Sequence, residues 1–267
     1  MLPISIFENG FSVFPRSSVI FLPAKNAPKA LAFRCTQAAV YGILALDMKN
    51  DRQQQNYTPC LDLESLFSQA AETEADIEFV SFENLALEGG AFPGLTFRNC
   101  RFVGCRITGC SMERAGWIDC TLEHCDLSNT SLPKSALERT RLTDCKLVGA
   151  TLSQAFLLDV TLADCVARYS NFSSSKFRHT RFNCCDLSFS ALSDCKLAQT
   201  TFERCLLVRA ELFQTTFSGV DLSDCDISGV AIGGTELRGA RVNLEQAAQL
   251  GQLLAGVLLS NPLPPRE

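Results

Sequence analysis

The chain has 267 residues and a formal net charge of −5, with 24 Lys and Arg against 29 Asp and Glu. No stretch of the sequence is apolar for long enough to cross a bilayer, and the first residues lack the basic flank of a secretory signal. We therefore expect no membrane span and synthesis in the cytoplasm, with a signal-peptide-independent system as the route of any secretion.

The charges are distributed unevenly along the chain. Residues 97–242 hold nearly equal numbers of acids and bases, whereas the segment from Asp62 to Glu88 has several acids and no Lys or Arg. A protein that binds the phosphate backbone carries a basic stripe, and no such stripe is visible here. We therefore expect no direct nucleic-acid partner.

Residues 1–76 form the first predicted unit. Apolar residues alternate in short runs between Ile4 and Phe33, and this pattern predicts short strands. Asp62 can cap a helix with one apolar face, and that face consists of Leu63, Leu66, Phe67 and Ala70. We expect a small β-rich cap with a short helix.

Residues 77–242 repeat with a period of five. Every fifth residue from Phe82 to Val242 is apolar, and two positions before each, from Cys100 to Ala240, stands only Cys, Ala, Ser, Thr or Val. Five helical residues scatter side chains around the axis, and five strand residues reverse the face. The chain must therefore turn a corner in every unit, with one small and one large residue pointing inward.

A second period gives the number of corners in a coil. Cysteine recurs every twenty residues, at Cys105, Cys125, Cys145, Cys165, Cys185, Cys205 and Cys225. Four units per coil would stack these residues on one another, which predicts an all-β, four-sided parallel solenoid. Most of the 14 cysteines occupy the small inward position, so we expect buried free thiols and neither a metal nor a cofactor.

Residues 243–267 form the last predicted unit. Asn243 and Gln246 have the spacing of a reciprocal N-terminal cap for a helix that runs to about Ala255. We expect this helix to cap the solenoid and to form a homodimer. The dimer contacts would come from its apolar residues, Leu244, Ala247, Ala248, Leu250, Leu254 and Leu258.

The repeat units resemble those of the pentapeptide-repeat proteins. Three examples are Cys-Asp-Leu-Ser-Asn (125–129), Cys-Lys-Leu-Val-Gly (145–149) and Val-Asp-Leu-Ser-Asp (220–224). The resemblance implies a right-handed quadrilateral β-helix. It implies little about function, because one architecture hosts unrelated functions.

Two narrower resemblances point to different functions. The C-terminal helix resembles the dimerisation helix of the quinolone-resistance and mycobacterial fluoroquinolone-resistance members, which protect type II topoisomerases as DNA mimics. That likeness implies an acidic surface, for which the candidates are Asp221, Asp224 and Asp226. The order of a β-rich unit, a helix and then repeats is similar to the PipB-type secreted effectors.

Outward-pointing apolar residues are the strongest functional signal in the sequence. They fall on one predicted face, edged by charged residues that include Arg168 and Arg209. Contiguous exposed apolar patches mark interaction sites. The candidate partner-binding residues are Val148, Val166, Tyr169, Phe189, Leu206 and Val208.

A catalytic site is a weaker alternative. The last position of each unit in one column reads His124, Asp144, Asp164 and Cys184, a row that could hold a metal or act in acid–base chemistry. Such evenly spaced groups do not converge on one point, so we expect no enzyme.

The sequence therefore predicts a non-enzymatic protein–protein interaction scaffold. Two classes remain open within this prediction. The first is a secreted bacterial effector or an intracellular adaptor, and the second is a topoisomerase (gyrase)-binding DNA mimic. A β-helix enzyme that acts on carbohydrate is the remote alternative.

Overall fold

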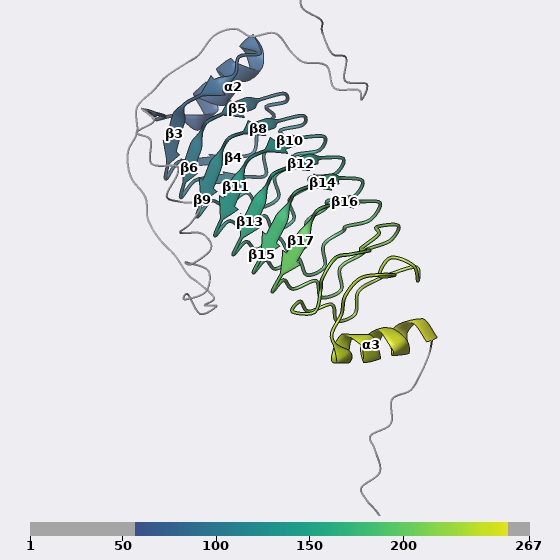
Figure 1. Cartoon of the computed structure of the whole chain (residues 1–267). Helices are drawn as coiled ribbons and strands as arrows, with labels where there is room; N and C mark the ends of the chain where they lie inside the picture. The colour runs from purple at the N-terminus through teal and green to yellow at the C-terminus, as the bar shows by residue number, and fades with distance from the viewer. Residues whose placement is uncertain (1–56, 256–267) are drawn as a thin grey trace, which may run out of the picture.

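The computed structural model of the chain describes residues 57–255 (Figure 1). The described part is a rod of stacked coils with one helix at each end. The strands predicted between Ile4 and Phe33 lie outside the described residues.

Helix α2 (Leu63–Thr73) covers the first end of the rod, as predicted. The side chain of Asp62 accepts a hydrogen bond from the backbone N–H of Ser65 at 3.2 Å, and the predicted apolar face of the helix is buried. Phe67 lies deepest, with its ring 5.3 Å from the ring of Phe97. This contact closes the apolar interior at the start of the solenoid.

Two faces of the rod are parallel β-sheets built from very short strands. The larger sheet contains, in order, β1 (Thr58–Pro59), β3 (Val80–Glu83), β6 (Arg101–Val103), β9 (Thr121–Glu123), β11 (Arg141–Thr143), β13 (Thr161–Ala163), β15 (Arg181–Asn183) and β17 (Thr201–Glu203). The second sheet contains β2 (Ile77–Glu78), β5 (Thr96–Arg98), β8 (Gly116–Ile118), β10 (Ala136–Glu138), β12 (Phe156–Leu158), β14 (Lys176–Arg178) and β16 (Lys196–Ala198). Strand β1 therefore adds a rung that comes from within the predicted N-terminal unit.

The other two faces are held mainly by isolated bridges between successive coils. The third face begins with β4 (Ala86–Glu88) and β7 (Arg106–Thr108) and continues through bridges such as Lys146 to Val166. The fourth face is a column of bridges from Ala91 to Ala231. From β2 and β3 onward the register in each column is twenty residues, as between Leu137 and Leu157, whereas β1 pairs with β3 at a separation of 22. The four-sided parallel solenoid is confirmed.

The inward positions form the core that the five-residue period predicts. The large residues from Phe82 to Ile227 are buried almost throughout, and the small residues between them are buried as well. Aromatic rings in neighbouring coils stack, as Phe182 and Phe202 do with centroids 4.9 Å apart. Burying one large apolar side chain contributes about 1.5–3 kcal/mol, so the column of such residues is the main source of stability.

The corners are made by residues in the left-handed backbone conformation. The fifth residue of most units has a positive φ, for example 57° at Asn129 and 67° at Gly149. On the two faces without long sheets, a turn hydrogen bond tightens the corner, as from Ala150 N–H to Leu147 O at 3.0 Å. This conformation favours Gly and Asn, and other residues adopt it at a cost.

The column of seven cysteines is buried and unoxidised. Each thiol from Cys145 onward lies close to a carbonyl of the preceding coil, as Cys145 Sγ does to Leu122 O at 3.4 Å. Contacts with the thiols of Cys145 and Cys185, together with burial, raise the pKa of the Cys165 thiol. The inward cysteines are buried in the small slots between the large apolar residues, as the packing role predicts.

Helix α3 (Leu244–Ala255) covers the far end of the rod, and its start follows the prediction. Asn243 Oδ1 accepts from Gln246 N–H at 2.9 Å, and Asn243 N–H donates to Gln246 Oε1 at 2.8 Å. The buried side-chain amide of Gln246 also donates to Leu222 O at 2.8 Å and to Cys225 O at 2.6 Å. One glutamine therefore caps both the helix and two carbonyls of the last coils.

Glu236 caps N–H groups near the same end. Its buried carboxylate accepts hydrogen bonds from Gln214 N–H at 3.1 Å, Gly234 N–H at 2.8 Å and Thr235 N–H at 3.0 Å. Burial alone would raise the pKa of this carboxyl, but the surrounding backbone N–H groups lower the pKa of Glu236 to about 2. The ionised form is the one that the fold stabilises.

We expect Glu236→Gln to destabilise the protein by about 2 kcal/mol at neutral pH, because it removes the charge that strengthens these hydrogen bonds. The folded pKa lies below the unfolded value of about 4.3, so the stabilisation is present above that pH and is lost as the pH falls toward 2. Thermal unfolding measured between pH 7 and pH 3 should show the gap between wild type and variant closing. A gap that stays constant with pH would contradict this role, and Glu245→Gln on the exposed start of α3 is the control.

Candidate interaction surface

The six predicted partner-binding residues lie in three adjacent columns of neighbouring coils. Val166 and Leu206 are exposed and belong to one column of bridges on the third face, with Asp186 between them. Val148 and Val208 are half-buried in the next column. Tyr169 and Phe189 stand at the corner that ends this face. We name these six residues the aromatic patch: Val148, Val166, Tyr169, Phe189, Leu206 and Val208.

The centre of the aromatic patch is a stacked pair of rings. Tyr169 and Phe189 have centroids 5.1 Å apart and an interplanar angle of 19°. The guanidinium of Arg168 lies 5.8 Å from the Tyr169 centroid and 5.7 Å from that of Phe189, and Arg209 lies 5.9 Å from Phe189. Cation–π contacts of this kind hold the rings in place. Tyr169 is nevertheless 57% exposed.

The backbone at both aromatic residues is costly. Tyr169 has φ 58° and Phe189 has φ 60°, in the left-handed region that bulky side chains disfavour. The same corner column carries Asn129 and Gly149, which suit this conformation. Neither aromatic residue suits its corner, which makes the pair a candidate site for binding a partner.

The structure divides the predicted dimerisation residues between two environments. Leu250 packs against the core and Ala248 is half-buried, so both belong to the cap. Ala247 is exposed, as are Leu244 at 88% and Leu254 at 51%. Leu258 lies outside the described residues. Sequence reasoning missed Leu253, which is 53% exposed beside Leu254 and could have been found from the helical period.

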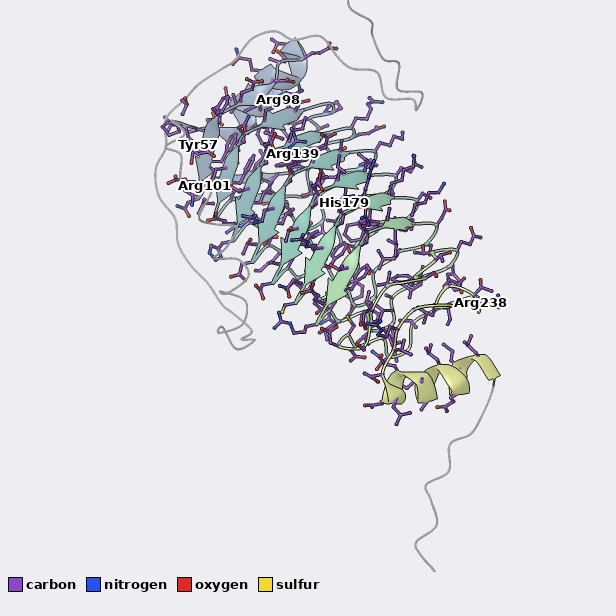
Figure 2. All side chains as sticks on the ribbon, in the orientation of Figure 1. Tyr57, Arg98, Arg101, Arg139, His179 and Arg238 are labelled. Atoms are coloured by element: carbon purple, nitrogen blue, oxygen red, sulfur yellow. The ribbon has the colours of Figure 1, made fainter. Side chains whose placement is uncertain are left out.

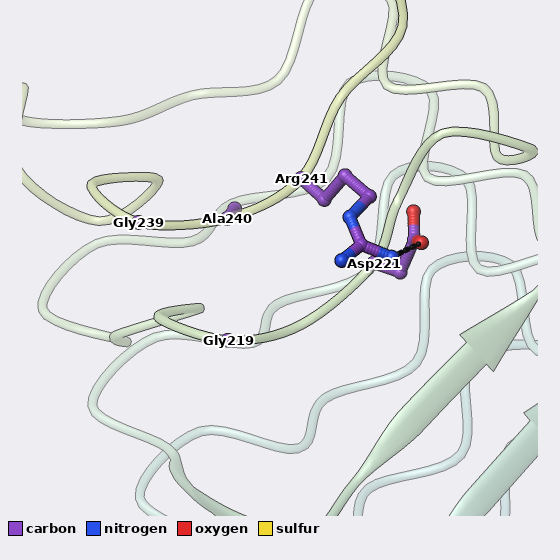
Figure 3. A pocket seen from close by; sticks show the side chains of 5 residues that line it. All are labelled: Gly219, Asp221, Gly239, Ala240 and Arg241. Atoms are coloured by element: carbon purple, nitrogen blue, oxygen red, sulfur yellow. Dashed lines mark hydrogen bonds and ion pairs between the residues drawn. The ribbon is translucent and has the colours of Figure 1, made fainter.

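The predicted acidic surface is partly neutralised. Asp221 forms an ion pair with Arg241 at 2.9 Å across a small pocket that Gly219, Gly239 and Ala240 also line (Figure 3). Hydrogen bonds from Ser223, together with Arg241, lower the pKa of Asp221. Asp226 accepts a hydrogen bond from Ser228 N–H at 2.9 Å, and Asp224 is exposed.

The column that begins at His124 is a row of corner residues on the rod surface. His124 Nδ1 lies 3.3 Å from Asp144 Oδ2, and both side chains are largely exposed. Burial, together with the charge of Asp144, raises the pKa of the next carboxyl, Asp164. Among residues 57–255, no three His, Cys, Asp or Glu side chains gather in a way that could hold a metal ion.

The described helices are also too short or too polar to cross a membrane; α2 and α3 have 11 and 12 residues.

The geometry defines a repeat protein with a solenoid body, short terminal helices and side chains displayed on its corners. The sequence profile described as the pentapeptide repeat region matches residues 115–190, and a profile of eight pentapeptide repeats matches residues 185–224 and 205–243. Residues 115–243 are therefore pentapeptide-repeat units, as the sequence predicts.

Among solved structures, the chain is similar to a trypsin-treated variant of QnrB1, a plasmid-mediated fluoroquinolone resistance protein. The identity is 20%, with 66% of this chain and 99% of the other covered and a TM-score of 0.41. It is also similar to HetL from the cyanobacterium Nostoc, a pentapeptide-repeat protein involved in the regulation of heterocyst differentiation. Here the identity is 16%, the coverage 75% and 95%, and the TM-score 0.32. No curated protein matches the sequence. These likenesses carry no information about a partner.

Proposed function

We propose that the protein is a non-catalytic scaffold that binds a protein partner through the aromatic patch. The observation that carries this proposal is the stacked pair of Tyr169 and Phe189, displayed at two costly corners and held by Arg168 and Arg209. Aromatic side chains and arginine are the residue types that anchor protein interfaces. The proposal is common to a secreted effector and an intracellular adaptor.

The charges around the aromatic patch indicate the chemistry of the partner. Lys146, Arg168 and Arg209 border the patch, while Asp186 is the acid between its two exposed aliphatic residues. Asp186 reaches Arg168 only at 3.8 Å. We infer a partner surface that presents an apolar anchor flanked by carboxylates, because such a surface would complement both the rings and the cations.

The double variant Tyr169→Asn with Phe189→Asn tests the proposal. Asn suits the left-handed corner, so relief of backbone strain should offset the lost ring contacts and leave the free energy of unfolding within about 1 kcal/mol of wild type. Loss of two anchor side chains should weaken partner binding by about a hundredfold. The measurement is capture of partners from lysate, followed by titration of the captured protein.

Phe79→Asn is the matched control, because Phe79 is also an exposed aromatic at a left-handed corner, with φ 56°. It lies at the first end of the rod, far from the patch. Equal affinity of wild type, control and double variant for the captured protein would refute the role of the aromatic patch.

A DNA mimic that binds gyrase is the second candidate. Its support is the exposed pair Asp224 and Asp226 near the C-terminal end. The support is weaker, because Asp221 is paired with Arg241 and the acids and bases along the rod are balanced. A mimic of DNA needs a continuous negative surface.

We also propose that the exposed leucines of α3 form a homodimer contact. Leu244, Leu253 and Leu254 present apolar surface that the cap does not use. The triple variant Leu244→Gln, Leu253→Gln and Leu254→Gln should therefore be monomeric under conditions where the wild type is a dimer. Light scattering after size-exclusion chromatography measures the mass. A wild type that is monomeric at high concentration, or a variant that stays dimeric, would contradict the proposal.

A further inference from the structure

Four cations gather at another corner of the rod. Lys176 and Arg178 lie on β14, Lys196 lies on β16, and Arg181 lies at the start of β15. All four residues are exposed. His179, labelled in Figure 2, marks the corner between β14 and β15 around which they stand. We name these four residues the basic corner.

The like charges of the basic corner are close together. Lys176 and Lys196 are register partners on adjacent strands, which places their backbones about 4.8 Å apart. Like charges directly opposite each other destabilise a sheet. Packing within the rod does not require this arrangement, because all four side chains point outward and the buried partner between Lys176 and Arg178 is Phe177.

Acids of the same chain do not neutralise the basic corner. At several other places on the rod, a cation faces an acid of the adjacent coil, as Arg139 faces Asp119 at 2.6 Å. Within residues 57–255, none of the four cations is within ion-pair distance of a carboxylate.

Three carboxylates on neighbouring positions have other partners or lie on another strand. Asp159 lies 3.6 Å from His179, and Asp194 accepts a hydrogen bond from Ser174 at 3.0 Å. Glu203 lies on β17 opposite Asn183, beyond Arg181. The basic corner therefore holds four exposed cations that are not paired with any of these carboxylates.

An apolar border lies beside these cations. Phe156 and Leu158 on β12 are the register partners of Lys176 and Arg178, and both are half-buried with outward-pointing side chains. The face thus combines two apolar side chains with two cations in adjacent strands. A surface of this composition fits a ligand that is acidic and partly apolar.

We propose that the basic corner binds an acidic segment of a protein partner in an extended conformation. Lys176 and Arg178 are two residues apart on the same side of one strand, a spacing of about 6.6 Å. Carboxylates at alternate positions of an extended peptide have the same spacing, so they can face both cations at once. Lys196 adds a third charge in the next rung.

A nucleic acid fits the basic corner less well. Along the rod axis the cations extend over only one coil spacing, from Lys176 to Lys196. Acids and bases are balanced in number along the remainder of the rod. A phosphate backbone would meet few cations there and would bind weakly at physiological salt. The extended acidic peptide needs only the cations that are present.

The basic corner is separate from the aromatic patch. Residues 169 and 179 are half of a twenty-residue coil apart, so the two corners lie diagonally across the rod. This inference goes beyond the proposed function, and either can fail without the other.

The test uses the full chain and a fluorescein-labelled ten-residue peptide of alternating Glu and Ser. The triple variant Lys176→Ser, Arg178→Ser and Lys196→Ser should bind the peptide about tenfold more weakly than wild type, because three exposed ion pairs are lost. Its melting temperature should stay equal or rise, since the repulsion between Lys176 and Lys196 is removed. Fluorescence anisotropy at low and at physiological salt measures the affinity.

The control removes the same charge elsewhere, with Arg114→Ser, Lys134→Ser and Arg238→Ser, and should bind the peptide as wild type does. Equal affinities of the triple variant and the control would overturn the proposal. Tighter binding of a single-stranded oligonucleotide of matched charge, lost in the triple variant, would also overturn it and would assign the corner to nucleic acid.

Discussion

The hydrogen bonds between successive coils are the interaction on which the rest of the structure depends. Each coil donates hydrogen bonds to both of its neighbours, as Lys146 N–H does to Cys125 O of the preceding coil at 2.8 Å and Leu147 N–H does to Val166 O of the following coil at 2.7 Å. These bonds require every coil to have the same length and the same corners. The left-handed residue at the end of each unit meets that requirement, and the small and large inward residues then stack on their equivalents.

The two ends of such a stack differ from its interior in how their backbone groups are satisfied. An interior coil satisfies its backbone groups through its neighbours, whereas the end coils need other partners. Phe67 of α2 fills the apolar opening at one end, and Gln246 and Glu236 supply polar caps at the other. The cap at the C-terminal end uses one face of α3, and this leaves Leu244, Leu253 and Leu254 exposed.

The outward positions are under no comparable constraint, so they can specify binding. Most corners carry Gly, Asn, Asp or another polar residue, and ion pairs such as Arg101 with Glu123 link adjacent coils. The aromatic patch and the basic corner depart from this pattern in different ways, one by strained aromatic residues and the other by uncompensated charge. The strained backbone of the aromatic patch and the repulsion between the cations of the basic corner both raise the free energy of the isolated rod. A bound acidic partner would relieve the repulsion between the cations directly.

Much of the fold could be predicted because the inward pattern is strict. The period from Phe82 to Val242, the column from Cys105 to Cys225 and the caps at Asp62 and Asn243 each follow from local chemistry. The capping contacts of Glu236 could not be predicted, because its sequence position is an ordinary outward one and its burial depends on the local path of the last coil.

The candidate surfaces could be predicted only in part, for the same reason. The sequence places Tyr169 near Phe189, but the ring stacking and the position of Arg168 depend on rotamers. The pairing of Asp221 with Arg241 and the lack of pairing around Lys176 depend on which neighbours the coil register brings together. A count of charges along the chain therefore cannot show which of them are paired.

Hydrogen exchange of the backbone amides tests the central claim, that the coils form one cooperative stack closed by its two end caps. The account predicts that the inter-coil amides of the central coils, such as those of Lys146 and Leu147, exchange only through global unfolding, with protection falling toward α3. Exchange in the central coils as fast as in α3 would contradict it.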